Sequence, residues 1–104
     1  MTTAGRKDDH GKLRWHLLSL KLLEPVVRVL MHGEGHYDAY NWQRVDNATE
    51  RYSNALMRHW TAHQGGEKAD PETGESHLAH VATNVLFLLY FELKEKEPSS
   101  ARGH

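Results

Sequence analysis

Histidines and acidic residues are concentrated between positions 58 and 84, in the sequence RHWTAHQGGEKADPETGESHLAHVATN. The first part of this segment places His59 and His63 four residues apart, which is about one turn of a helix. Two imidazoles at this spacing can bind one ion, although the pattern alone is weakly specific. The chemistry to consider is therefore metal binding and acid–base catalysis by neutral imidazole.

The second part of the segment places His77, His80 and Asn84 on one helix face, at steps of three and four residues. A single histidine in such a stripe commonly bonds to a helix end or to another histidine. Three polar groups together are less easily explained, because each buried polar side chain costs about 1–3 kcal/mol unless it is paired. We therefore expect this stripe to line a site or a water-filled cleft.

Between the two parts lie Glu67, Asp70 and Glu72, whose carboxylates are hard oxygen ligands of the kind that Mg²⁺ or Mn²⁺ prefers. The alternative is a solvated acidic loop, which we expect for Glu75, with Asp70 in an Asp-Pro turn. If the loop belongs to a site, the predicted metal ligands are Glu67, Asp70, His77 and His80. The predicted catalytic residues are Asp70, His59 and His77.

Arg58 carries a planar guanidinium that matches phosphate oxygens, although it could also form a surface salt bridge. Tyr37 or Trp42 could stack on a base while Asn41 bonds to its edge, and packing against the helices is the alternative use of these rings. The residues of this set that could bind a ligand are therefore Tyr37, Asn41, Trp42 and Arg58.

The elements that must position these residues are helices, because no stretch alternates with the period of a strand. Residues 15–32 carry an apolar stripe at helical spacing, and Ser19 is a possible N-cap. Pro25 interrupts this stripe, so we expect either a kink or a new helix with Pro25 in its first turn. The stripe consists of Leu18, Leu22, Val26, Val29 and Leu30.

Gly33 and Gly35 are expected to end this first helical segment, and residues 33–47 to form a loop. A second helix is predicted from Ala48, capped by Asn47, to about residue 64, and a third from 77 to about 94, capped by Ser76. The inward face of the second helix is predicted to consist of Tyr52, Leu56, His59, Trp60 and His63.

The chain of 104 residues is predicted to be one all-α domain, a small bundle of three to four helices. Residues 1–11 are expected to be a flexible arm, residues 12–95 the nucleotide-handling domain, and residues 96–104 a disordered tail. Because only 38% of the residues are hydrophobic, one subunit would have a thin core. We therefore expect a homo-oligomer to complete the bundle.

Composition excludes several classes of function. The 13 basic and 14 acidic residues nearly balance, so a polymer of nucleic acid is not an expected partner. The longest apolar run, residues 85–91, is far shorter than the roughly 20 residues of a membrane span. No cysteine and no signal peptide is present, which fits a cytoplasmic protein. P-loop, Rossmann and serine-hydrolase motifs are absent.

Several blocks of the sequence resemble the dATP/dGTP diphosphohydrolase domain that is common in phage genomes, which is related in outline to all-helical, MazG-like nucleotide pyrophosphohydrolases. The blocks are KLRWHLL, LLEPVVRVLMHG, HYDAYNW, LMRHW and, most specifically, GGEKADPETGESHLAHVATN. The resemblance covers residues 12–89. It implies that the substrate-binding residues are Lys12, Tyr37, Asn41, Trp42, Arg58 and Asn84, with Lys12 neutralising phosphate charge. It implies a phage-encoded enzyme that releases pyrophosphate from purine deoxynucleoside triphosphates with Mg²⁺ or Mn²⁺.

The sequence departs from the family pattern at several positions. His36 replaces a lysine, Asp38 replaces a glycine, and Ser19 and Leu20 replace a proline-rich helix start. The Glu-Glu-x-x-Glu helix that binds metal in better-known MazG-like enzymes is absent. Two alternatives to an enzyme therefore stay open. One is a non-catalytic oligomer that sequesters a nucleotide or a nucleotide-derived immune signal. The other is a structural helical protein whose histidines only pair with one another.

Overall fold

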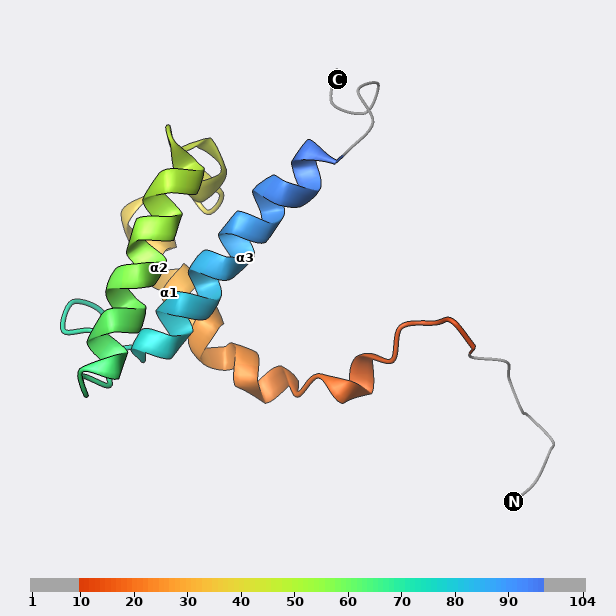
Figure 1. Ribbon diagram of the computed structural model, residues 1–104, viewed down its shortest axis with the longest axis horizontal. Helices are drawn as coiled ribbons and strands as arrows, with labels where there is room; N and C mark the ends of the chain where they lie inside the picture. The colour runs from red at the N-terminus through yellow and green to blue at the C-terminus, as the bar shows by residue number, and fades with distance from the viewer. Residues whose placement is uncertain (1–9, 97–104) are drawn as a thin grey trace.

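The computed structural model describes residues 10–96 and is all-helical, as predicted (Figure 1). Within that range no strand is present, and the backbone between α2 and α3 forms one isolated bridge from Ala69 to Ser76. Most of the predicted arm and tail, residues 1–9 and 97–104, lies outside the described residues. The elements are the 3-10 turns η1 (Trp15–Leu17), η2 (Leu20–Leu23) and η3 (Asn41–Arg44), and the helices α1 (Glu24–His36), α2 (Ala48–Gln64) and α3 (His77–Glu95).

Helix α1 begins at Glu24 with Pro25 in its first turn, which confirms the second of the two alternatives for this proline. A proline is tolerated there because the first amides of a helix have no intrahelical partner. The preceding residues form η1 and η2, which Figure 1 shows leading away from the three helices. Ser19 precedes η2, but its side chain does not cap it.

The predicted end of this helix at Gly33 and Gly35 is wrong, because α1 continues to His36. Glycine weakens a helix by about 1 kcal/mol relative to alanine, but it can adopt helical dihedral angles without strain. The helix ends where Tyr37 turns into an extended conformation, with its amide bonded to the carbonyl of Gly33. Half of the predicted loop is thereby helix or 3-10 turn, since η3 follows at residue 41.

The predicted bounds of α2 and α3 are confirmed to within a residue. Ser76 caps α3 by accepting a hydrogen bond from the amide of Leu78, at 3.1 Å. Asn47 precedes α2 in a left-handed conformation and makes no side-chain cap. These two helices pack against each other, closely where the end of α2 meets the beginning of α3, and diverge toward the C-terminal end of α3, while α1 packs on α3 (Figure 1).

An aromatic cluster fixes η3 against the α2–α3 pair. Trp42 stacks on Phe87 with ring centroids 4.3 Å apart and meets the ring of Tyr90 edge-on. Tyr52 of α2 packs on Phe87 as well, and its hydroxyl donates a 2.8 Å hydrogen bond to the carbonyl of Trp42. Trp42 was predicted either to stack on a base or to pack against the helices. At least one face of its ring is used for packing.

The buried interior of this chain is small and largely polar. Among residues 10–96, the buried apolar side chains are Val26, Ala48 and Ala79, whereas the buried polar ones are His77, His80, Thr83 and Asn84. The polar inward stripe predicted for α3 is thus confirmed. Trp60, predicted to face inward from α2, is 40% exposed, because its position on the helix turns it past the contact with α3. No described helix is long and apolar enough to cross a membrane.

Candidate functional site

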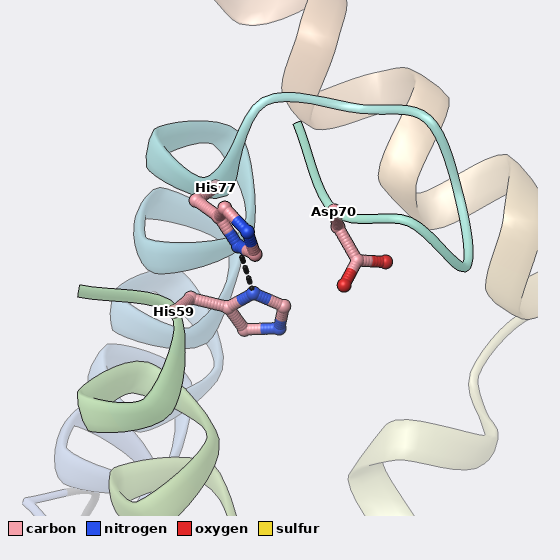
Figure 2. Close-up of side chains that lie close together, drawn as sticks. All are labelled: His59, Asp70 and His77. Carbon is pink, nitrogen blue, oxygen red and sulfur yellow. Dashed lines mark hydrogen bonds between the residues drawn. The ribbon is translucent and has the colours of Figure 1, made fainter. Parts of the chain in front are cut away.

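A cluster of imidazoles forms where the end of α2 meets the beginning of α3. The Nδ1 atoms of His59 and His77 face each other at 2.8 Å (Figure 2). The rings of His59 and His80 stack with centroids 4.2 Å apart and planes nearly parallel. One residue of α2 therefore contacts two histidines of α3. His77 and His80 are three residues apart, so both project from the same side of the helix.

The loop between α2 and α3 folds back on itself and brings carboxylates to these histidines. Gly66 allows the chain to leave α2, with a φ of 100° that favours glycine. The amide of Asp70 donates to the carbonyl of Glu75 at 2.8 Å, and the amide of Gly74 donates back to the carbonyl of Asp70 at 2.7 Å. The amide of His77 then bonds to the carbonyl of Lys68, which closes the loop onto α3.

Glu67 contacts His77 on the ring edge away from His59. Its Oε1 lies 2.7 Å from His77 Nε2, and His77 itself is only 3% exposed. A carboxylate only accepts hydrogen bonds, so in a neutral ring the proton of His77 lies on Nε2 and its Nδ1 has a lone pair. Glu67 thus sets the tautomer that turns a basic nitrogen toward His59.

Thr73 joins Asp70 to His80. Its amide and hydroxyl donate to Asp70 Oδ2 at 3.0 and 3.1 Å, and its Oγ1 lies 2.8 Å from His80 Nε2. Because the single hydroxyl proton goes to Asp70, His80 donates from Nε2 to Thr73. The sequence analysis did not single out Thr73. A threonine three residues after an aspartate is a turn signal that would have identified it.

The protonation states of this cluster favour cation binding. Burial lowers the pKa of His59, and the neighbouring His80 lowers it further. Burial likewise lowers the pKa of His80, against the opposing effect of Asp70. Burial would raise the pKa of Asp70, but the two hydrogen bonds from Thr73 and the nearby histidines hold it below its usual value. Near neutral pH, neutral His59 and His80 therefore lie beside an ionised Asp70.

These donors fit a metal ion. One nitrogen from each of His59 and His77 and one oxygen of Asp70 lie within 4.8 Å of one another (Figure 2). In the part of the chain that the structure describes, this is the one group of three such residues. It contains all three predicted catalytic residues but only two of the four predicted metal ligands. The other two predicted ligands lie outside this group of three: Glu67 contacts His77, and His80 stacks on His59.

Two further predictions about this region need correction. His63 does not join His59 at the cluster, because the partner of His59 comes from α3 rather than from the next turn of α2. Glu75, expected to be solvated, is mostly buried and paired with α1, where Arg28 Nε donates to its Oε1 at 3.0 Å and His32 Nε2 lies 3.7 Å from its Oε2.

A cavity of about 620 Å³ opens beside the cluster, between α1, η3 and α3. Thr73 and His80 belong to both the cavity wall and the cluster, so the two are adjacent. Four predicted substrate-binding residues line the cavity, and they are Tyr37, Asn41, Trp42 and Asn84. The amide of Asn84 donates to the carbonyl of His80 at 2.8 Å, so it also supports the helix.

Two predicted phosphate-binding residues lie elsewhere. Lys12 is in the exposed segment before η1, and Arg58 borders a shallow depression on the outer side of α2. The cationic residue that the cavity wall does contain is Arg51, in the first turns of α2. Arg51 could not be identified from sequence, because the side of α2 that faces the cavity depends on how that helix packs on α3 and η3.

A family model for the dATP/dGTP diphosphohydrolase, N-terminal, matches residues 2–101, nearly the whole chain. The chain belongs to this family. Among curated proteins, a dATP/dGTP diphosphohydrolase of Salmonella phage PMBT28 is 36% identical over 96 residues. The resemblance noted in the sequence is thereby confirmed.

The match covers 92% of this chain but 32% of the phage protein. This member of the dATP/dGTP diphosphohydrolase N-terminal family therefore spans about a third of the length of the relative it matches. No solved structure matches the chain. Its helical arrangement is accordingly described from this structure alone.

Proposed function

We propose that this chain is a metal-dependent pyrophosphohydrolase that acts on purine deoxynucleoside triphosphates, with Mg²⁺ or Mn²⁺ as the ion. The observation that carries the proposal is the donor set of His59, Asp70 and His77, which is adjacent to a cavity of about 620 Å³. The name of the phage relative, a dATP/dGTP diphosphohydrolase, supplies the substrate class.

In this proposal the purine occupies the aromatic end of the cavity. Tyr37 is 65% exposed, so its ring is available to stack on a base, and Asn41 can bond to the base edge. Arg51 neutralises phosphate charge in the role first assigned to Lys12 and Arg58. The phosphates then extend toward His80 and Thr73, where the cavity adjoins the cluster.

The chain's own groups have distinct tasks at the reacting end. A bound divalent ion would polarise a phosphoryl oxygen and lower the pKa of a water molecule. Asp70, kept ionised by Thr73, supplies negative charge for that ion. His80 lines the cavity and is neutral near pH 7 because burial lowers its pKa. Its Nε2 donates to Thr73, so we assign its Nδ1 to accept a proton from the attacking water.

A nucleotide hydrolysis screen tests the proposal. The chain is incubated with each purine nucleoside triphosphate and Mn²⁺ or Mg²⁺, and products are identified by mass spectrometry. The expected products are the monophosphate and pyrophosphate. Asp70→Asn should abolish their release, whereas Glu50→Gln, an exposed acid in the first turn of α2, should not. Intact nucleotide after prolonged incubation of the wild-type chain would refute catalysis.

A second candidate is a binding module that holds a nucleotide or a nucleotide-derived immune signal without cleaving it. Two observations favour it: Lys12 and Arg58 lie away from the cavity, and this chain corresponds to about a third of the named relative. Denaturing a complex and recovering unchanged ligand would support this module. Recovering hydrolysed ligand would exclude it.

We also propose that the chain forms a homo-oligomer, with a phage-infected cytoplasm as its location. Large apolar side chains are exposed along the N-terminal segment and on α3, including Trp15 at 69% and Leu93 at 56%. Such surfaces commonly mark interfaces. Light scattering after size-exclusion chromatography should give a mass that is a multiple of 12.0 kDa, and a monomer at all concentrations would contradict this proposal.

A further inference from the structure

The cluster at the α2–α3 junction contains more nitrogen donors than a typical magnesium site. We infer that His59, Asp70 and His77 form a transition-metal site that selects Mn²⁺ or Zn²⁺ over Mg²⁺, with Glu67 as a positioning residue and not a ligand. This inference rests on the site of the proposed function but does not require turnover. It also narrows the predicted choice between Mg²⁺ and Mn²⁺ as the bound ion.

The donor set supports the choice of ion. Mg²⁺ requires a near-octahedral shell of oxygen atoms and retains several waters, whereas imidazole nitrogen suits Zn²⁺. Mn²⁺ is the weakest binder of the first-row transition ions, but as a transition ion it accepts nitrogen ligands more readily than Mg²⁺ does. Here two of three donors are imidazoles, and their donor atoms and one carboxylate oxygen already lie within 4.8 Å of one another. Three protein ligands leave positions open for water or a phosphate oxygen.

The tautomer of His77 makes its Nδ1 the metal-binding atom. With the ring proton on Nε2, bonded to Glu67 at 2.7 Å, the lone pair of Nδ1 points to His59. Two nitrogens on one ion, each at about 2.1 Å, lie roughly 3.0–3.4 Å apart. In the ion-free chain His59 Nδ1 donates its proton to His77 Nδ1 at 2.8 Å. An ion between the rings therefore requires the proton of His59 to move to Nε2 and the pair to open slightly.

Glu67 is placed to contact the ligand His77 and not the ion itself. It binds the nitrogen of His77 that faces away from the cluster, and its own side chain is 53% exposed. Carboxylates in this position fix the orientation of a ligating histidine and raise its basicity. His59 needs no such partner, because its ring contacts His77 (Figure 2) and stacks on the ring of His80.

The test begins with titration of the full chain with MnCl₂, ZnCl₂ or MgCl₂ in separate calorimetry experiments. Mn²⁺ and Zn²⁺ should bind, and Mg²⁺ should bind at least tenfold more weakly than Mn²⁺. Asp70→Asn and His77→Gln should remove this binding, whereas His16→Gln, an exposed histidine of η1, should retain it. Circular dichroism checks that each variant keeps its helices.

The role of Glu67 has its own readouts. Glu67→Ala should weaken Mn²⁺ binding about 10–100-fold, and Glu67→Gln should recover most of it because the amide oxygen still accepts from His77. Long-range ¹H–¹⁵N NMR of the ion-free chain should show His77 protonated on Nε2. Equal affinities for Mg²⁺ and Mn²⁺, or no binding of any ion, would overturn the metal assignment. Protonation on Nδ1, or equal losses in the alanine and glutamine variants, would overturn the role of Glu67.

Failure of this inference is distinguishable from failure of the proposed function. A chain that binds Mn²⁺ at these residues but leaves every nucleotide intact supports the inference and refutes catalysis. A chain that hydrolyses nucleotides equally well with Mg²⁺ as with Mn²⁺, and binds both ions equally, refutes the inference and supports catalysis.

Discussion

The loop joining α2 to α3, taken with the helix ends that it connects (residues 59–80), and the segment preceding α1 are organised in opposite ways. The loop region is polar, and its buried side chains are partnered within the chain, as in the contacts of His77 with His59 and Glu67. The N-terminal segment is rich in leucine and contains Trp15, and its apolar side chains are exposed, with Leu20 at 69% and Leu22 at 73%. The two regions thus invert the usual relation between polarity and burial.

This contrast indicates which region restricts the chain to a single folded arrangement. A buried polar network holds one arrangement because each group left without a partner costs free energy. Apolar side chains in contact with water impose no such constraint and are suited to covering another surface. The loop is therefore the region in which small changes should have large effects on the folded chain.

The largest expected effect comes from His77→Ala compared with Leu20→Ala. Removal of the buried imidazole leaves His59 and Glu67 without their partner and opens a cavity, so the free energy of unfolding should fall by about 2–4 kcal/mol. Leu20→Ala should change it by less than about 0.5 kcal/mol. Urea denaturation monitored by circular dichroism measures both. Similar losses in the two variants would remove the contrast.

A smaller loss is expected for Thr73→Val, which keeps the shape of the side chain but removes its hydroxyl. Asp70 loses one of its two donors from Thr73, and His80 loses its partner, so unfolding should become easier by about 1–3 kcal/mol. Thr61→Val, on the exposed side of α2, is the matched control. A stability equal to the wild type would show that the hydroxyl does not join these residues.

The loop should also make stability depend on pH. The pKa values of His59 and His80 are lowered from 6.5 by burial, so the unfolded chain binds protons more readily than the folded one. The free energy of unfolding should therefore fall as the pH drops from about 7.5 to about 5.5. The pKa of Asp70 is also lowered, and its contribution is lost only near or below 3.8. His80→Gln should flatten the upper part of this profile, and an unchanged profile would contradict the assignment.

The smallest effect on folding is expected in the N-terminal segment. Trp15→Ser should leave the unfolding transition of the separated subunit within about 0.5 kcal/mol, because this side chain is mostly exposed. The same substitution should lower the mass of the assembly in analytical ultracentrifugation if this segment covers a second copy. A marked loss of subunit stability would show that Trp15 packs within its own chain.

The elements were largely predictable from sequence, because their signals are local. Ser76 and the periodicity after it defined α3, and Pro25 placed the start of α1. The end of α1 was not predictable from sequence, because Gly33 and Gly35 permit a helix as well as a turn. Exposure of the N-terminal leucines was also missed, because helical spacing does not reveal whether a partner surface exists.

For the candidate site, the sequence indicated the residue types but not which of them meet. His59 and His63 share a helix face by spacing, yet His59 pairs with His77 because of how α2 and α3 pack. The curl of the loop brings Asp70 toward the cluster and turns Glu67 to the far edge of His77. These relations depend on tertiary packing, which spacing alone does not determine.

The most direct test is the location of the ion itself. Crystals of the chain grown with MnCl₂ and a non-hydrolysable dGTP analogue would be measured at the manganese absorption edge. We predict an anomalous difference peak bounded by His59, Asp70 and His77, with the analogue in the cavity lined by Tyr37 and Asn41. A peak at other residues, or an analogue bound with no peak at this cluster, would contradict the assigned site.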